Sequence, residues 1–426
     1  MQKALLIVGL AITIVACGPN NKPVNSDTGS SNTSVFGTEL TDCSEKPIRF
    51  DAPPVPLNKI EHIEPMGKMG GHSGHITPTD HLYIQVNSDA PKSVPVQATA
   101  DGHLVKITKM PDREGSSDWR AIIEHSCSVF SWYIHLDGFS DTILEQITLP
   151  SSNRPWYGRI PVVSGQAVGH VGEVLSYQRG KDEFDWAVTD TSVVLSGFVI
   201  PDHYSGEPWK IHTVSPYDYY DDPLKTDLER KSLRTTAPIG GKIDFDIDGR
   251  LAGNWFLDGT RDYMGSGLAE AGESSWTKIL GMDPGDCKAP LWDNKSQRDL
   301  GYRPCAYWLG HAVFAYDHLA PDRILVSLGI HYDEYGGIHT PLMVLNNGPD
   351  PAEVDINTGQ VKYEVLRGNV TRGMLHREET LPEKDSVEGT LLIEMLDTRS
   401  IKVELFIGTT ADGVSDFTEK AKIYRR

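Results

Sequence analysis

After about residue 43, the chain repeats short runs in which apolar and polar residues alternate. A period of two is typical of strands with one buried face, and Gly, Pro and Asp between the runs predict tight turns. The runs in the first half are HLYIQV (81–86), HLVKITKM (103–110), WRAIIEHS (119–126), VFSWYIHLD (129–137) and FDWAVTD (184–190). Those in the second half are GKIDFDIDG (241–249), LAGNWFLDG (251–259), RILVSLGIHY (323–332), VKYEVL (361–366), GTLLIEMLD (389–397) and IKVELFIG (401–408).

The two groups of runs predict an all-β protein with two bodies. The first body spans residues 43–223 and the second spans 232–426, and 426 residues leave room for two cores. Residues 224–231 belong to a polar, charged stretch that predicts a connector with at most one short helix. We expect an antiparallel sheet in the first body and an antiparallel barrel or sandwich in the second.

The N-terminus predicts export and membrane attachment. Residues 1–16 are typical of an export signal, because their apolar run, residues 4–16, is too short to span a bilayer. The sequence IVAC at 14–17 resembles a bacterial lipobox, which implies lipidation at Cys17 and a lipid-anchored protein. Gly18 in place of Asp implies the outer membrane, facing the periplasm or the cell surface. Residues 17–42 are rich in Ser, Asn, Thr, Gly and Pro and predict a flexible tether after the anchor.

Charge and cysteine content limit the possible binding partners and predict disulfide bonds. A net charge of -19 without a basic stripe argues against nucleic-acid binding. Four cysteines follow Cys17, and an even number in an exported chain predicts two disulfides. Three pairings are open, and we expect Cys287 with Cys305, which would close a short loop, and Cys43 with Cys127.

A series of short motifs in the first body carries a family resemblance. In order, these are VQATADGHLVKI (96–107), the strand end YIHL (133–136), SGQAVGHVG (164–172) and FDWAV (184–188). Their order and spacing over about residues 70–190 resemble LytM/lysostaphin-type zinc metallopeptidases, which cut cross-bridges in bacterial cell walls. The resemblance implies an antiparallel sheet with a metal cleft on one face.

The resemblance also implies a ligand set, and the first motif can be placed in two ways. The family binds zinc through a His, an Asp four residues later and the second His of a His-x-His strand. His75 and Asp80 offer the right residue types but lie five apart, which on a straight strand places them on opposite faces. His81 and Gln85 have the right spacing, but Gln is a poor zinc ligand.

The remaining positions depart in part from the family pattern. Glu183-Phe184-Asp185 stands in place of His-x-His, so that Asp185 could bind a metal through oxygen. His135 matches the family's Tyr-x-His-Leu motif, which implies a catalytic role in positioning or deprotonating water. The candidate metal site is therefore an altered one, such as His81, His135 and Asp185 together with His75 or Asp80, with zinc as the cofactor if a metal binds.

Aromatic residues of the first body and aspartates of the second body are further candidates for ligand contacts. Trp132, Tyr133 and Trp186 are candidate contacts for a peptide or glycan, with core packing as the alternative. In the second body, Asp244, Asp246 and Asp248 lack the Glu of a calcium-binding loop, so we interpret them as a solvated strand face.

Three functions stay open at this stage. The first is a non-catalytic envelope protein that binds peptidoglycan or a partner protein through a degenerate LytM-like domain. The second is a zinc endopeptidase that acts on peptidoglycan cross-links, with His135 as base. The third is a structural scaffold of the envelope.

Overall fold

The structure is a computed structural model. It describes residues 33–41, 43, 47–70, 75–90, 92–113, 116–150, 155–172, 181–260, 262–264, 310–329, 341–345, 347–367 and 387–426. Among these, strands dominate, which confirms the predicted all-β class. The helices are short: α1 (Asp141–Leu144) and α2 (Leu224–Glu229), with single-turn 3-10 segments between strands. No helix in the described ranges has the length and apolar character needed to cross a membrane.

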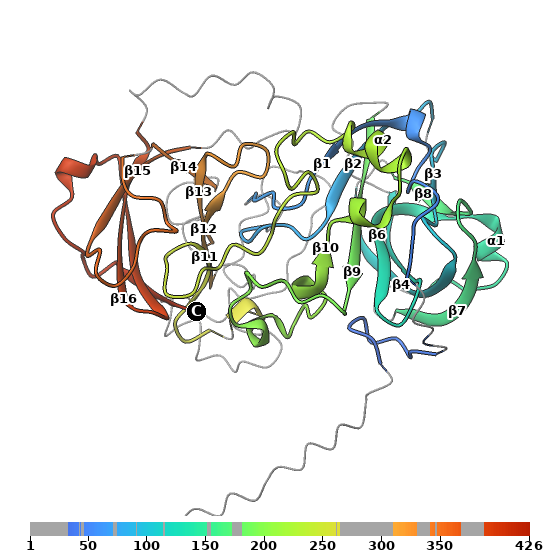
Figure 1. The fold of residues 1–426 in the computed structure, drawn as a ribbon, viewed down its shortest axis with the longest axis horizontal. Helices are drawn as coiled ribbons and strands as arrows, with labels where there is room; N and C mark the ends of the chain where they lie inside the picture. The colour runs from blue at the N-terminus through green and yellow to red at the C-terminus, as the bar shows by residue number, and fades with distance from the viewer. Residues whose placement is uncertain are drawn as a thin grey trace, which may run out of the picture. The chain divides into compact units, whose positions relative to one another are not determined.

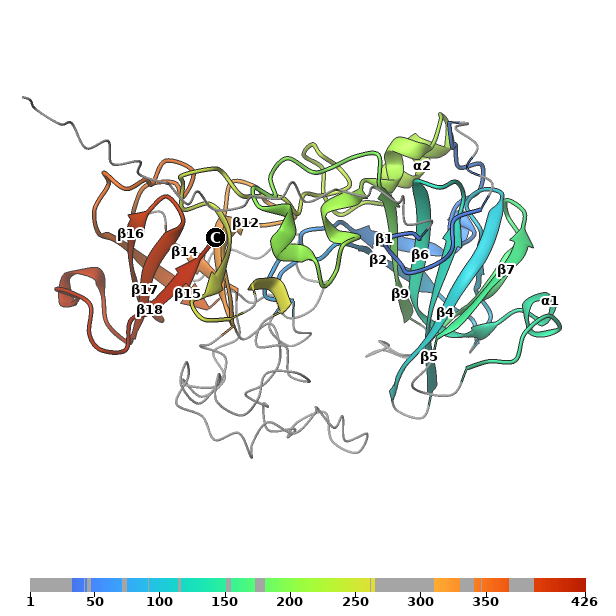
Figure 2. The same ribbon diagram turned by 90° about the horizontal axis from the view of Figure 1, so that it is seen from below.

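The first group of strands forms one antiparallel sheet (Figure 1). Its main path runs β1 (Ile60–Glu64), β2 (Leu82–Asn87), β9 (Lys181–Asp190), β6 (Val129–Phe139), β5 (Ser116–Glu124), β4 (Gly102–Arg113) and β7 (Trp156–Val162). Three short strands join it from the side: β3 (Pro95–Gln97), β8 (Ala167–Val171) and β10 (Thr213–Val214). Figure 2 shows β9, β6, β5 and β4 side by side. The order places β9 between β2 and β6, so distant motifs become neighbours.

Both faces of this sheet are covered by other residues. Along β5, Ala121 and Ile123 belong to the main apolar cluster, whereas Ile122 packs in a smaller cluster with Trp132 and Phe36. The sheet therefore has a core face and an opposite face, which we call the second face. A strand buried on both sides has a weak alternation of apolar and polar residues, as WRAIIEHS does.

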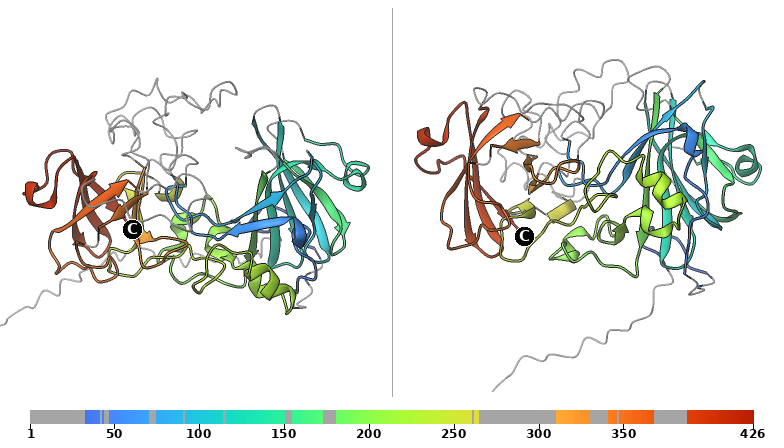
Figure 3. Two further views of the ribbon diagram at one scale, coloured as in Figure 1. Left: turned by 90° about the horizontal axis from the view of Figure 1, so that it is seen from above. Right: turned by 45° about the horizontal axis from the view of Figure 1, so that its top comes forward.

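The second group closes into a barrel, which settles the choice between barrel and sandwich. The strands are β11 (Gly253–Leu257), β12 (His311–Tyr316), β13 (Ile324–Leu328), β14 (Leu342–Val344), β15 (Val361–Arg367), β16 (Gly389–Asp397), β17 (Ser400–Ile407) and β18 (Lys422–Arg425). β18 pairs with both β17 and β11, which closes the ring. Figure 3 shows the orange and red strands β14 to β17 curving around one another.

One predicted strand is wrong. The stretch 241–249 forms an irregular loop rather than a strand. Asp244 Oδ2 accepts a hydrogen bond from the Gly197 amide at 2.9 Å, and Asp246 Oδ1 accepts one from the Asn254 amide at 2.7 Å. These carboxylates bind the backbone of neighbouring segments, so Asp246 is buried instead of facing solvent. Side chains with such partners compete with strand pairing.

One of the two expected disulfides is confirmed. Cys43 and Cys127 are bonded, with their Cα atoms 5.0 Å apart. The bond ties the start of the first body to the turn before β6. The expected Cys287–Cys305 pair and the lipidation site Cys17 lie outside the described residues.

Candidate metal centre

Three neighbouring strands bring the candidate ligands together. His81 immediately precedes β2, Asp185 lies in β9, and His135 lies in β6. The register pairs Tyr83 with Asp185 on one side and Ile134 with Asp185 on the other. Asp185 therefore sits between the two histidines, which are 54 residues apart in the sequence.

A bulge in β6 aims His135 toward Asp185. Tyr133 packs in the main apolar cluster on the core face, and simple alternation would place His135 on that same face. Asp185 lies on the second face, because its neighbours Phe184 and Trp186 both belong to the main cluster. The β5–β6 register shifts between Trp119 and Ala121, and His135 takes a positive φ of 68°. An extra residue of this kind re-aims a side chain, and the left-handed backbone costs about 1–2 kcal/mol.

Two of the three donor pairs have a separation close to that of zinc ligands. His81 Nε2 and His135 Nε2 each lie 3.3 Å from Asp185 Oδ2. Two ligand atoms of a tetrahedral zinc ion, each at about 2.1 Å, lie about 3.4 Å apart. His81, His135 and Asp185 are 4%, 6% and 3% exposed, so the cluster is shielded from water.

Each histidine is oriented by a second carboxylate on its other ring nitrogen. His81 Nδ1 lies 3.1 Å from Asp80 Oδ1, and His135 Nδ1 lies 3.0 Å from Asp118 Oδ2. A carboxylate behind an imidazole fixes the ring so that Nε2 faces the metal. Asp80 thus lies on the opposite side of the His81 ring from Asp185. Its predicted role as a direct ligand is corrected to one of orienting His81.

His75 is the remaining predicted ligand. Its ring centroid lies 5.4 Å from that of His81, with the ring planes 69° apart. Burial and the neighbouring His81 lower the pKa of His75 to about 3, so its ring is neutral at pH 7. A neutral imidazole is the form that binds metal. His75 therefore lies beside His81 with its ring neutral.

Electrostatics hold the cluster as an ion pair when no metal is present. Burial opposes the charge of His135, but Asp185 and Asp118 outweigh it and raise the pKa of His135 to about 9. Burial likewise opposes the charge of Asp185, but His81 and His135 lower its pKa to about 2. A proton on His135 therefore occupies the place of a metal cation, and metal binding would release it.

The donor chemistry fits zinc. Among the described residues, no group of three or more His, Cys, Asp or Glu side chains stands at the spacing needed to hold a metal ion. Two imidazoles and a carboxylate are nevertheless a common zinc set. His81 Nε2 and Asp185 Oδ1 are buried without a hydrogen-bond partner. Buried polar atoms without partners are costly, and a cation between them would satisfy both.

Two further positions of the pattern that the resemblance implies hold other residue types. Gln85 pairs in register with Glu183, where the resemblance implies an Asp and a His. Lys68 reaches this region: its Nζ lies 2.6 Å from Glu64 Oε2 and 4.6 Å from the centroid of the Tyr83 ring. Burial, with Glu64 and Asp185 nearby, raises the pKa of Glu183 to about 7 despite the Lys68 ammonium. A tethered ammonium beside these two positions disfavours a metal ion there.

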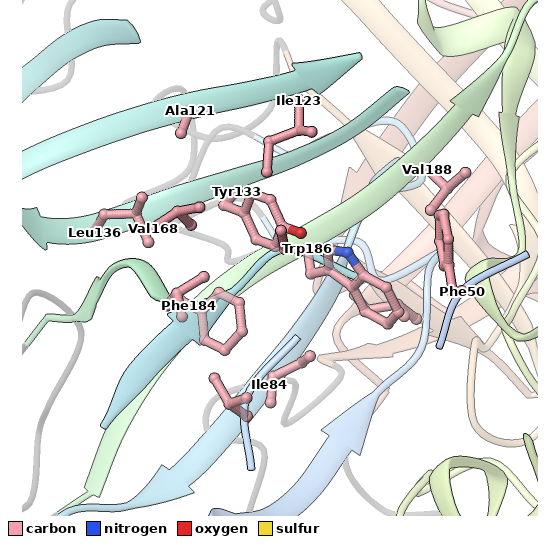
Figure 4. Packing of buried hydrophobic residues seen from close by; sticks show 14 of the residues in the cluster. Phe50, Ile84, Ala121, Ile123, Tyr133, Leu136, Val168, Phe184, Trp186 and Val188 are labelled. Atoms are coloured by element: carbon pink, nitrogen blue, oxygen red, sulfur yellow. The ribbon is translucent and has the colours of Figure 1, made fainter. Parts of the chain in front are cut away.

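The predicted substrate contacts are core residues instead. Trp132 is 1% exposed, and Tyr133 and Trp186 are both 0% exposed. Figure 4 shows Tyr133 and Trp186 among other aromatic and aliphatic side chains of the main cluster. Trp132 donates from Nε1 to Thr189 Oγ1 at 3.1 Å on the second face. These three rings are buried in the protein and are not available to a substrate.

Sequence reasoning missed several members of the site. Asp118 and Arg120 lie in β5, and no local motif distinguishes them from ordinary strand residues. Trp209 lies just before a 3-10 turn and donates from Nε1 to Asp80 Oδ2 at 3.1 Å. Lys210 Nζ lies 3.9 Å from the same oxygen. All four reach the site through long-range contacts.

Comparisons with known proteins give limited structural similarity. No family model and no curated protein match the sequence. The chain is similar to a zinc-containing peptidase from Vibrio cholerae, with 19% identity over 34% of this chain and 37% of that one, at a TM-score of 0.23. It is similar to lysostaphin from Staphylococcus simulans, with 14% identity over 51% and 71% of the two chains, at a TM-score of 0.26.

A further similar structure is Csd3 from Helicobacter pylori, with 16% identity over 33% and 32% of the two chains and a TM-score of 0.21. The chain spans about a third of the length of Csd3 and of the Vibrio peptidase. At these identities and TM-scores the likeness assigns neither a family nor an activity. The case for a metal centre therefore depends on the side chains described above.

Proposed function

We propose that the sheet is a LytM-like module that binds zinc through His81, His135 and Asp185 and does not cleave peptides. The observation that carries this proposal is the shared contact of both Nε2 atoms with one oxygen of Asp185, at 3.3 Å each. Asp80 and Asp118 support it, because each orients one histidine from behind.

Two features favour binding over hydrolysis. A hydrolytic zinc ion keeps one open position for water, which it acidifies toward neutrality. His75 lies beside His81, and in this proposal it adds a fourth donor, as in a closed site. His135 points at Asp185 as a ligand would, so it is not placed to act as a separate base.

We further propose that the protein works in a bacterial envelope, where the module binds peptidoglycan or an envelope partner. The Cys43–Cys127 disulfide supports an oxidising compartment. The resemblance in the motifs supports a cell-wall ligand, and the lipobox at 14–17 supports attachment to the outer membrane through Cys17.

The test is the zinc content of the full chain, purified from an oxidising compartment without chelator. We expect about one zinc per chain, lost in His81→Ala and His135→Ala. His103→Ala is the matched control, since His103 lies in β4, away from the cluster. No zinc after incubation with the metal would contradict the proposal.

The same preparation separates binding from hydrolysis. Zinc-loaded protein should sediment with purified peptidoglycan and release no soluble fragments over hours. Release of fragments that disappears in His81→Ala would favour the endopeptidase instead. Neither sedimentation nor release would leave the scaffold as the function to pursue.

A further inference from the structure

Arg120 is held between two indole rings next to the metal centre. Its guanidinium carbon lies 4.7 Å from the ring centroid of Trp132 and 4.8 Å from that of Trp209. Stacking on both sides fixes a planar group and limits the rotation of its side chain. Phe36 stacks in turn on Trp209, with the ring planes 15° apart, and holds that indole in place.

The guanidinium has no polar partner among the residues that the structure describes. In these ranges no hydrogen bond or ion pair involves Arg120, and its Nε is buried without a hydrogen-bond partner. The side chain is nonetheless half-buried rather than enclosed, so part of it reaches the surface. An arginine presents five N–H donors in a fixed fork, and a buried donor without an acceptor is costly.

Both indoles connect Arg120 to the proposed ligands. Trp209 donates to Asp80, the carboxylate behind His81, at 3.1 Å. The Trp132 ring lies 5.8 Å from the His81 ring. Arg120 also lies on the second face of the sheet, because its neighbours Trp119 and Ala121 both pack in the main cluster. The guanidinium therefore flanks the metal centre on the same face.

We propose that Arg120 binds a carboxylate of the module's ligand beside the metal centre. The inference rests on the proposed function and deepens it, because it makes the ligand a peptide with a free carboxylate. A carboxylate matches the arginine fork with two parallel hydrogen bonds. The stacked indoles position the fork in advance, which lowers the entropy lost on binding.

Local charge favours a carboxylate over a phosphate. Asp80, Glu207 and Asp185 lie close enough to interact with Arg120, although none forms an ion pair with it. Lys210, which is buried near Asp80, compensates part of this negative charge. A single additional negative charge is tolerated better than the nearly two charges of a phosphate group.

The test uses soluble peptidoglycan fragments, either untreated or with their carboxylates converted to amides. Zinc-loaded full-length protein should bind the untreated fragments and bind the amidated ones at least tenfold more weakly. Arg120→Gln should weaken binding of untreated fragments roughly tenfold to a hundredfold, and Arg120→Lys should restore part of it. Inorganic phosphate should compete less well than acetate at equal concentration.

Arg159→Lys is the matched control, because the partly exposed Arg159 already has a partner, the buried Glu124 carboxylate, at 2.9 Å. It should bind the fragments as the wild type does. Zinc content and the thermal midpoint of each variant report whether the fold and the metal centre persist.

Equal binding of free and amidated fragments, or unchanged binding by Arg120→Gln, would overturn the inference while zinc content still supports the metal centre. Absence of zinc would instead overturn the proposed function. Equal competition by phosphate would overturn the preference for a carboxylate.

Discussion

The sheet and the barrel use their buried volume differently. The second face of the sheet buries several ionisable groups in contact with one another, among them His81, His135 and Asp185. The main barrel cluster instead consists of aliphatic and aromatic side chains such as Leu391, Phe314 and Trp255. A small barrel of this size is filled by its side chains. Buried charges cost desolvation energy, so the contact of several such groups in the sheet indicates a site.

The barrel also buries charged side chains, and the surroundings of Arg426 explain how. The Arg426 guanidinium donates to the backbone carbonyls of Asn254, Ile247 and three further residues, Arg250, Leu251 and Ala252. It also lies 4.0 Å from the Trp255 ring centroid. Its donors are satisfied by carbonyls, whereas those of Arg120 in the sheet lack such partners. The same residue type is structural in one region and available to a ligand in the other.

The largest expected effect comes from Asp185→Asn, which removes the charge shared by both histidines. We expect the free energy of unfolding to fall by about 3 kcal/mol in the chelator-treated protein, because a buried ion pair loses one partner. Zinc binding should also be lost. Urea unfolding and metal analysis measure the two effects.

Leu391→Ala in the barrel is the matched control for that variant. Leu391 is fully buried, and its truncation should also lower the free energy of unfolding by about 3 kcal/mol. Zinc should stay at one per chain, because the barrel core is not part of the site. Equal zinc content in Asp185→Asn and Leu391→Ala would contradict the assignment of the metal centre to the sheet and not to the barrel.

A smaller effect concerns the pH dependence of stability in the barrel. Burial lowers the pKa of His311, at the start of β12, to about 3. The unfolded chain takes up this proton near pH 6.5, before the folded protein does, so stability should fall as pH drops below 6.5. At pH 5 the loss should be about 2 kcal/mol from this group.

The measurement compares urea unfolding of wild type and His311→Gln from pH 7 to pH 5. The variant should lose less stability over that range, because Gln does not titrate. Parallel pH profiles for the two proteins would contradict the assignment.

The smallest effect should come from Asp118→Asn, which keeps the shape but removes the charge behind His135. Zinc affinity should fall roughly tenfold to a hundredfold, as expected for a group that orients a ligand. Competition with a zinc chelator measures this, and Asp137→Asn provides a control on the same strand β6. Complete loss of zinc would indicate that Asp118 is itself a ligand and would contradict the proposed ligand set.

Much of the fold could be predicted from local pattern. The runs at 129–137 and 389–397 lie in strands, as does the run at 81–86 after its first residue, because period-two alternation and turn residues act over short distances. The run at 241–249 failed because Asp244 and Asp246 bind distant amides, which no local pattern reports. Three site residues could likewise be named from motifs, whereas the aromatic contacts could not. Trp132 lies on the second face of the sheet, and Tyr133 and Trp186 lie on the core face. Both faces are buried, so an aromatic residue on either face packs inside the protein.

The sequence by itself determined the strand content, the Cys43–Cys127 pairing as an expectation, and the residue types of the candidate site. The tertiary structure decided which of those residues meet. The bulge at His135 turned its ring to the second face, the order β2-β9-β6 placed Asp185 between two histidines, and Arg120 came to lie between two indoles. The physical reason is that donor geometry depends on strand order and register, and these are set by packing between residues far apart in the chain.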